Sequence, residues 1–264
     1  MLMQNKIKTI AEAAALVADG DSLALGGMTM YRRPVAFARA LIKRPTPPRD
    51  LTLLAFTGGL AADILVGAGL VRYTRTCYFG LEAFGLAPMF TDAVHTGRVT
   101  VIEESEASIA NGLRATAAGV GFMPSRAWQG TDMLNARPDV HTITDPYTGR
   151  QLTAFPALHV DVVAIHVLRA DAYGNAVLGG NPTIDVELAQ IAPRIILTAE
   201  KVVDHLDGPV DIIGLPVSAV VEAPKGAWPT SCYPEYPLDG QAVLAYLAAC
   251  RNGSFADFVQ GLQP

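Results

Sequence analysis

The chain has 264 residues, of which 50% are hydrophobic and 17% are charged, and its formal net charge is -5. This length allows one large domain or two small ones, and we expect a single domain over residues 1–264, with ample apolar material for a core. The mildly acidic balance lacks the Lys/Arg stripe that phosphates demand, which argues against a nucleic-acid partner.

Helix and strand patterns alternate through the first half of the chain. Glycine and proline delimit them: Gly20 closes the first helix, and Pro34 stands in the first turn of the second. The predicted elements, in chain order, are a helix over 9–20, a strand over 22–27, a helix over 34–44, strands over 51–59, 75–80 and 99–104, and a helix over 106–119 capped by Ser105.

One apolar segment, residues 51–71, is long enough to resemble a membrane span. Four glycines and Asp63 lie within it, which favours a strand, a glycine turn and a short helix instead. The N-terminus also lacks the apolar core and cleavage site of a signal peptide. We therefore expect a soluble protein that does not contact a membrane.

A Pro- and Gly-rich stretch over roughly residues 122–158 predicts an irregular segment between two halves. Strands resume over 160–167 and 194–199. Between them, residues 179–192 predict a glycine turn and a helix with Asn181 as its cap and Pro182 at its first position. Continuous apolar strands alternating with amphipathic helices predict an α/β fold, a mainly parallel open sheet with helices on both faces.

Three predicted strands end in glycine, at Gly26-Gly27, Gly58-Gly59 and Gly80. In parallel sheets ligands bind beyond the carboxyl ends of the strands, and glycine lets backbone N–H groups approach a ligand closely. Any single glycine here is explained equally well by a tight turn. Three together favour a binding site.

Two arginines, Arg32 and Arg33, follow the first glycine pair. A guanidinium beside a glycine backbone suits a carboxylate, although solvated loop charges are the simpler interpretation. Neither G-x-G-x-x-G nor G-x-x-x-x-G-K-[ST] occurs in the chain, which disfavours a dinucleotide dehydrogenase or a P-loop enzyme.

The cysteines and histidines predict no metal site. Cys77, Cys232 and Cys250 are widely spaced and odd in number, which favours a reducing cytoplasm over a disulfide framework, and no CxxC or HExxH pairing occurs. His166 lies in an apolar run and is expected to be a hydrogen-bonded core residue.

The segment "DGDSLALGGMTMYRRP" resembles the first signature of the class I coenzyme A-transferases, an Asp-Gly pair, three apolar residues, Gly-Gly-Phe and a nearby Pro. It departs at Met28, where the family usually has Phe, and at Arg32, where many members have Gly. The arginine variant resembles the alpha subunits of the glutaconate CoA-transferase branch. The likeness continues in order through "LEAFGLAPMFTDAV", "FMPSRAWQGTDML", "DPYTGRQL", "IHVLRADAYGNA" and "SAVVEAPKGAWPTSCYPEY".

The resemblance implies a CoA-transferase/NagB-RpiA-like fold and a known reaction. In that family a glutamate attacks an acyl-CoA thioester, giving an acyl-glutamyl anhydride and CoA thiolate. The thiolate then forms a glutamyl-CoA thioester, from which a second carboxylic acid collects the CoA. Coenzyme A is thus a substrate, and no permanently bound cofactor is expected.

The family's Ser-Glu-Asn-Gly nucleophile motif is absent, the nearest string being "ESEASIANG". The resemblance therefore implies an alpha subunit whose beta-subunit partner supplies the glutamate, in a cytoplasmic heteromer. The residues implied to line the substrate site are Gly26, Gly27, Met28, Arg32, Thr57, Gly58 and Gly80. The expected acid is a di- or oxo-acid.

Two alternatives remain open. Relatives that hydrolyse β-keto-acyl-CoA rings in steroid degradation use an alpha-subunit glutamate, and Glu106 aligns best with it among Glu103, Glu104 and Glu106. The simpler interpretation is that these acids are solvated or favour the N-terminus of the following helix. The other alternative is a non-catalytic homologue that binds acyl-CoA.

Overall fold

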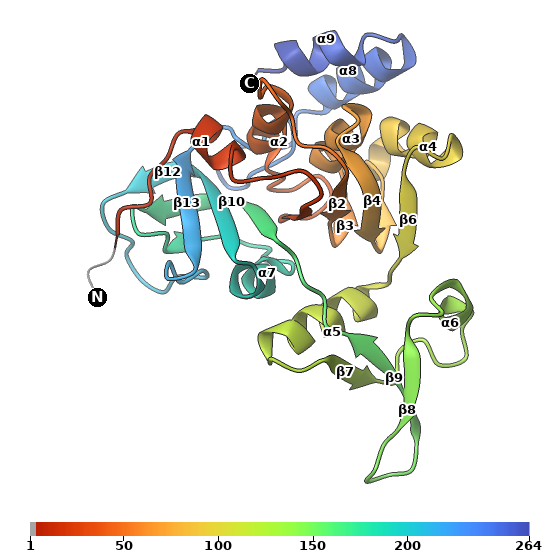
Figure 1. Cartoon of the computed structure of the whole chain (residues 1–264). Coiled ribbons are helices and arrows are strands. Elements are labelled where there is room, and N and C mark those ends of the chain that lie inside the picture. Colours follow the sequence, from red (N-terminus) through yellow and green to blue (C-terminus); the bar gives the residue numbers. More distant parts are fainter. Residues whose placement is uncertain (1–3, 264) are drawn as a thin grey trace.

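The centre of the molecule is an eight-stranded sheet in the order β13-β12-β10-β1-β2-β4-β6, with β11 paired to β10 (Figure 1). The computed structural model describes residues 4–263. Every strand pair on this path is parallel, and only β11 runs antiparallel to its neighbour. The predicted mainly parallel sheet is confirmed. Its strands are β1 (Ser22–Leu25), β2 (Leu51–Leu54), β4 (Val71–Thr76), β6 (Thr100–Glu103), β10 (Val162–Asp171), β11 (Ala176–Val177), β12 (Arg194–Val203) and β13 (Val217–Glu222).

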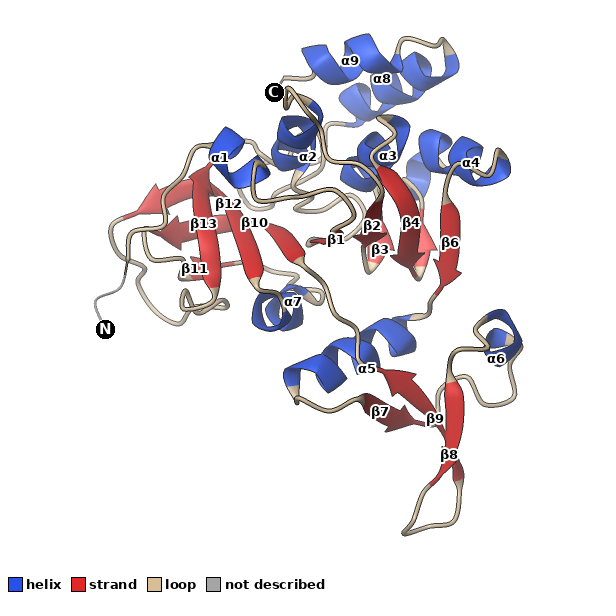
Figure 2. Ribbon diagram, viewed as in Figure 1, coloured by secondary structure: helices blue, strands red, loops and turns tan. Residues whose placement is uncertain are grey.

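Helices cover both faces of the sheet, as predicted (Figure 2). The strands are apolar on both sides, and β10 is buried continuously over its first six residues, so each face needs a cover. One face packs on α1 (Ile10–Ala14), α2 (Val35–Ile42), α3 (Leu60–Gly67), α4 (Pro88–His95), α8 (Gly240–Arg251) and α9 (Phe255–Gly261). The other packs on α5 (Glu106–Ala117) and α7 (Asp185–Ile191).

Two predicted helices are shorter than expected. The first ends at Ala14 rather than near Gly20, although Thr9 and Glu12 form a capping box at its start. Helix α7 begins only at Asp185, and its N-cap residue is Ile184, so the prediction that Asn181 caps this helix is wrong. Asn181 instead remains in the loop before α7.

The stretch expected to be irregular forms a small antiparallel sheet, which we call the arm (residues 122–156). It comprises β7 (Phe122–Ser125), α6 (Met133–Ala136), β8 (His141–Thr144) and β9 (Gln151–Pro156), in the strand order β7-β9-β8. A separate core supports it, in which the rings of Trp128 and Phe155 meet edge to face at 4.9 Å. In Figure 1 the arm extends below the main sheet, beyond α5.

The apolar segment at residues 51–71 contains β2, the two-residue strand β3 (Thr57–Gly58), α3 and the first residue of β4. Within residues 4–263, no helix combines the length and apolarity needed to cross a membrane. The short strand β5 (Tyr78–Phe79) pairs with β3, and a 3-10 turn, η1 (Glu82–Phe84), follows it.

Candidate active site

The topological switch point of the sheet lies between β1 and β10. From β1 the chain moves through α2 to β2 on one side, whereas from β10 it moves to β12 on the other. In open parallel sheets ligands bind at the carboxyl edge near such a point. Gly26 and Gly27 follow β1 there, so the structure places the first predicted glycine pair at this edge.

Protein atoms fill the space beside both glycines. A Cβ on Gly26 would lie 2.8 Å from the Oδ1 atom of Asp185. Gly27 has φ +76°, and a Cβ there would lie 2.5 Å from the carbonyl oxygens of Tyr31 and Arg32. The backbone N–H of Gly27 donates to the Asp185 carboxylate at 2.9 Å. These glycines are therefore required by packing inside the chain, and the expectation of exposed backbone N–H groups fails at this turn.

Arg32 is fully buried and forms an ion pair with Asp185 at 2.9 Å. Its guanidinium also donates to the carbonyl oxygens of His166 (2.8 Å) and Asn181 (2.6 Å). Burial raises the pKa of Asp185, and the charge of Arg32 opposes that rise. The prediction that Arg32 clamps a substrate carboxylate is not supported, because its guanidinium already holds three acceptors of its own chain.

Arg33 is also fully buried, on the opposite side of the same turn. Its Nη1 atom donates to the carbonyl oxygens of Leu25 (3.2 Å), Gly26 (2.7 Å) and Gly27 (3.2 Å). Burial lowers the pKa of Arg33 to about 10, which leaves it charged at neutral pH. The two arginines thus shape the turn from inside.

The other two glycine-ended segments lie beside this turn. Thr57 accepts the backbone N–H of Thr29 at 2.9 Å, and Gly80 donates to the carbonyl of Gly58 at 3.1 Å. A Cβ on Gly58 would meet the ring of Phe79 at 2.6 Å. The three segments do meet at one edge of the sheet, but close packing explains their glycines.

A pocket of about 350 Å³ is lined in part by the residues that precede the two buried arginines. Residues 27–32, which we call the pocket loop, supply four of its lining residues, and Glu82 is its one charged residue. The lining comprises Met28, Thr29, Met30, Tyr31, Glu82, Ala83, Phe84, Asn181, Ser231 and Leu238. We call this cavity the edge pocket. Met28 is the one predicted site residue that lines it.

Two residues of the edge pocket have strained backbone. Thr29 has φ 34° and Glu82 has φ 54°, left-handed values that cost a non-glycine residue of order 1–3 kcal/mol. The side-chain amide of Asn181 donates to the sulfur of Met28 at 3.4 Å, which joins the loop before α7 to the pocket loop. Strain of this kind persists where the surroundings hold it, and it is common at functional sites.

The three clustered glutamates have different surroundings. Glu104 is buried and forms ion pairs with Arg75 and Arg137, whereas Glu103 and Glu106 are exposed. Burial and the nearby charge of Glu106 raise the pKa of the Cys77 thiol to about 11. Glu106 therefore lies near the carboxyl end of β4, on the same edge of the sheet as the glycine turns.

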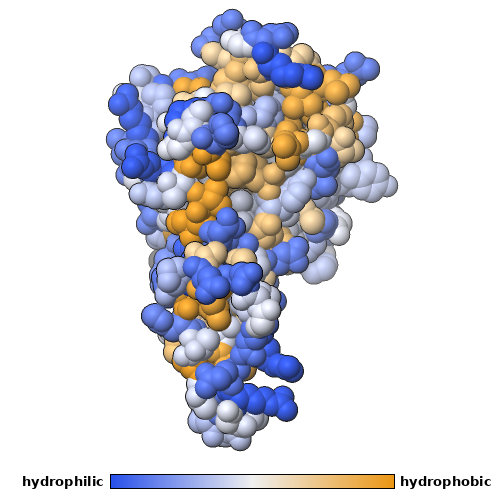
Figure 3. Space-filling view, turned by 90° about the vertical axis from the view of Figure 1, so that its right-hand side faces the viewer, coloured by the Kyte–Doolittle hydropathy of each residue, from blue (hydrophilic) through white to orange (hydrophobic). Residues whose placement is uncertain are grey.

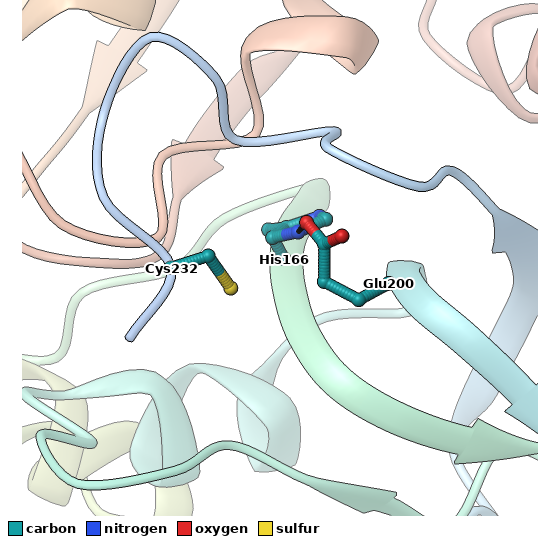
Figure 4. A group of neighbouring side chains, drawn as sticks. All are labelled: His166, Glu200 and Cys232. Atoms are coloured by element: carbon teal, nitrogen blue, oxygen red, sulfur yellow. Dashed lines mark hydrogen bonds and ion pairs between the residues drawn. The ribbon is translucent and has the colours of Figure 1, made fainter. Parts of the chain in front are cut away.

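A second polar cluster contains His166, Glu200 and Cys232 (Figure 4). His166 is buried, and its ring nitrogens pair with Thr198 (2.9 Å) and Glu200 (2.7 Å), which confirms it as a hydrogen-bonded core residue. Burial lowers the pKa of His166, which favours the neutral ring, and the hydrogen bond to Glu200 opposes this shift.

The same cluster keeps its thiol protonated. Glu200 also accepts the hydroxyl of Tyr236 at 2.5 Å and the N–H of Lys225 at 2.6 Å. Burial raises the pKa of Cys232 to about 12. The cluster has the residue types of a metal site, but His166 and Glu200 are bonded to each other and the thiol of Cys232 holds its proton.

Sequence reasoning missed Asp185 and Glu200, and it did not predict that Glu104 is buried between two arginines. Asp185 and Glu200 have partners that lie 158 and 34 positions away along the chain. Spacing along the chain therefore carries no signal for them. The one available hint was Arg32-Arg33, since two adjacent arginines need counter-charge wherever they are buried.

Residues 7–222 match the coenzyme A transferase family model. The chain belongs to this family. It is 34% identical over 254 residues to the A subunit of 3-oxoadipate CoA-transferase from Pseudomonas knackmussii, covering 94% of this chain and 89% of the relative. It is 30% identical over 265 residues to the A subunit of glutaconate CoA-transferase from Acidaminococcus fermentans, covering 92% and 82%.

Solved structures agree with this assignment. The glutaconate coenzyme A-transferase of A. fermentans superposes with a TM-score of 0.89 at 28% identity, over 97% of this chain and 87% of that one. A variant of the decarboxylase AibA/AibB superposes with a TM-score of 0.91 at 30% identity, over 98% of both chains.

The chain also resembles a hydrolase subunit in sequence. The cholesterol ring-cleaving hydrolase IpdA subunit of Mycobacterium tuberculosis is 29% identical over 268 residues, covering 95% of this chain and 90% of the relative.

The predicted family and the CoA-transferase fold are thereby confirmed. The CoA-transferase relatives are each named as one subunit of an enzyme. Their names imply a second subunit, which supports the prediction that this chain is the alpha subunit of such an enzyme.

Proposed function

We propose that this chain works with a separately encoded beta subunit to move CoA from an acyl-CoA to a free carboxylic acid. The observation that carries the proposal is the family match across residues 7–222, combined with relatives that are named as the A subunits of CoA-transferases. The beta subunit supplies the glutamate that forms the glutamyl-CoA thioester, because the family's nucleophile motif does not occur in this sequence.

The edge pocket is the proposed site for the acyl group. Its volume of about 350 Å³ suits a short acyl chain but not the whole of coenzyme A. Met28, Phe84 and Leu238 give it an apolar wall, and Asn181 and Ser231 offer hydrogen bonds to a carbonyl or hydroxyl. The pantetheine and nucleotide parts of CoA would then extend toward the beta subunit.

We infer a dicarboxylic or oxo-acid as the acceptor, following 3-oxoadipate and glutaconate in the names of two relatives. The lining of the edge pocket contains no Lys, Arg or His. A second carboxylate on the substrate therefore takes its counter-charge from outside this pocket, and the beta subunit is the proposed source. Kinetics with matched mono- and dicarboxylic acceptors test this inference.

One face of the molecule exposes apolar side chains to which we assign the contact with the beta subunit. Figure 3 views the side that carries α4 and β6, where apolar side chains form a broken band from the upper body down to the narrow arm. Leu86, just before α4, is 71% exposed, and Phe122 at the start of the arm is 43% exposed. Contiguous apolar patches mark surfaces that bind other proteins, and this band is the proposed contact face for the beta subunit.

Co-expression with the beta subunit tests the proposal. The complex should transfer CoA only when an acceptor acid is present, and it should form a hydroxylamine-sensitive acyl-enzyme on the beta subunit. The isolated chain should do neither. Transfer by the isolated chain would refute the division of labour, and a complex that never forms an acyl-enzyme would indicate a non-catalytic homologue.

Hydrolysis of a cyclic β-keto-acyl-CoA is the second candidate. The exposure of Glu106 at the carboxyl edge, near Cys77, favours it, as does the likeness to a ring-cleaving hydrolase subunit. The test is ring opening in the absence of any acceptor acid. Glu106→Gln should abolish that reaction, whereas it should leave CoA transfer to an acceptor acid within about threefold of wild type.

A further inference from the structure

One buried carboxylate holds both ends of the pocket loop. Oδ1 and Oδ2 of Asp185 accept the N–H of Gly27, the first residue of the loop, at 2.9 and 3.1 Å. Oδ2 also accepts Nη2 of Arg32, the last residue of the loop, at 2.9 Å. The residues between these two points line the edge pocket.

The side chains of Asp185 and Arg33 hold one peptide unit from both sides. The N–H of the Gly26–Gly27 peptide donates to Asp185, and its carbonyl oxygen accepts Nη1 of Arg33 at 2.7 Å. A peptide unit bonded on both sides cannot rotate without breaking a charge-assisted hydrogen bond. The direction in which the pocket loop leaves β1 is therefore set by buried side chains that do not line the pocket.

The loop itself is strained and needs such an anchor. Met28 and Tyr31 exchange two backbone hydrogen bonds, of 2.9 and 2.6 Å. Within and after this narrow turn, Thr29 has φ 34° and Arg32 has φ 49°, both left-handed. Non-glycine residues stay in this conformation only where the surroundings hold them, and the side chain of Arg32 is held by Asp185.

We propose that Asp185 is a positioning residue of the active site, which fixes the pocket loop in the geometry that receives the acyl group. Its action is indirect, because its side chain is fully buried and does not line the edge pocket. The use of this pocket in CoA transfer rests on the proposed function. The anchoring of the loop does not, and it is measured separately.

The first experiment is amide hydrogen exchange on the complex with the beta subunit, followed by mass spectrometry. In Asp185→Asn the peptides covering residues 27–32 should exchange at least about tenfold faster than in wild type, because the charge that holds both ends is lost. Peptides from β2 and β12 should keep their protection. Unchanged exchange in residues 27–32 would overturn the proposal, whether or not the complex has transferase activity.

The second experiment separates positioning from folding. The paired variant Arg32→Met with Asp185→Leu replaces the buried ion pair by apolar side chains of similar volume, which is often neutral for stability. It also removes the partners of the Gly27 N–H and of the His166 and Asn181 carbonyls. Assayed at a temperature where circular dichroism shows the variant folded, its kcat should be about 10- to 100-fold lower than wild type, with KM for the acyl-CoA changed less than threefold. A wild-type kcat in the folded variant would show that Asp185 has a structural role only.

Asp63→Asn is the matched control. Asp63 is also buried, and it also accepts backbone N–H groups and one side chain, but it joins α3 to α4 and α8. The kcat of the complex that carries Asp63→Asn should stay within about twofold of wild type. A similar loss of kcat in this control would show that any buried carboxylate has the same effect, and the assignment to Asp185 would be withdrawn. If the wild-type complex transfers no CoA, the proposed function fails, and the exchange experiment alone decides the role of Asp185.

Discussion

Arg137 of the arm donates to the carboxylate of Glu104, at the end of β6, across 2.9 Å. The side chains are 7% and 2% exposed, and Arg75 of β4 pairs with the same Glu104 oxygen. Arg137 also donates to the backbone carbonyl of Glu103 at 2.8 Å. One buried negative charge thus links Arg137 of the arm to Arg75 of the main sheet.

Glu104→Gln should therefore destabilise the chain by about 1–3 kcal/mol, because Arg75 loses its counter-charge and Arg137 keeps only its ion pair with Asp139. The free energy of unfolding from urea titration measures this change. Glu103→Gln is the control, since the side chain of Glu103 is exposed, and it should stay within about 0.5 kcal/mol of wild type. Similar losses in both variants would contradict the buried-charge account.

Gly27 and Gly20 provide a matched test of packing at the turn. Both have φ close to +75°, but a Cβ on Gly20 has no atom within 4 Å, whereas one on Gly27 would meet two carbonyl oxygens at 2.5 Å. Gly20→Ala should cost about 1–2 kcal/mol, the ordinary penalty of the left-handed conformation. Gly27→Ala should cost about 3–5 kcal/mol, since backbone must also move. Thermal unfolding distinguishes them, and equal costs would argue against close packing at Gly27.

The raised pKa of Asp63 leads us to expect a stability that falls as pH rises from about 4 to 6. Burial raises its pKa to about 6, although hydrogen bonds from Tyr246 and from the backbone of Phe90 and Met89 oppose the rise. Between about pH 4 and 6 the folded chain therefore holds a proton that the unfolded chain has released. The contribution of this group falls as pH rises through that window, by about 3 kcal/mol at most. Asp63→Asn should remove this part of the slope, and an unchanged slope would show that Asp63 is ionised in the fold.

The thiol of Cys77 reports on the position of Glu106. With its pKa raised to about 11, first by burial and then by the charge of Glu106, Cys77 should react with iodoacetamide at pH 8 about 100-fold more slowly than a free thiol. Glu106→Gln should accelerate this reaction. Cys250 is the internal reference, since burial raises its pKa to about 11 as well, without a contribution from Glu106. Mass spectrometry of both sites gives the two rates, and acceleration at both would indicate general loosening of the fold.

Much of the fold could be predicted from the sequence because its signals are local. The apolar strand of residues 160–167 and the capped helix after Ser105 are contained in short windows of sequence. The carboxyl ends of parallel strands lie at one edge of a sheet, so the meeting of the Gly26, Gly58 and Gly80 segments could also be predicted.

The details of the site could not be predicted, because they depend on partners far apart in the chain. In the sequence Arg32 and Arg33 resemble solvated loop charges. Only the fold shows that Asp185, 153 positions beyond Arg32, pairs with it. The strands of the arm are short, and β7 contains Pro124, which is atypical of a strand. Their pairing depends on β9, about thirty residues further along the chain.

The pairing of β1 with β10 sets an order of assembly during synthesis. Ser22 at the start of β1 bonds to Asp161, 139 positions later, and Leu23 lies beside Val162. In a nascent chain β2, β4 and β6 can thus assemble on one side of β1 before β10, the strand that pairs with its other side, has been synthesised. Arg32 meets its carboxylate only after Asp185 has left the ribosome, so a product truncated before that residue has no partner for this cation and exposes an open strand edge prone to aggregation.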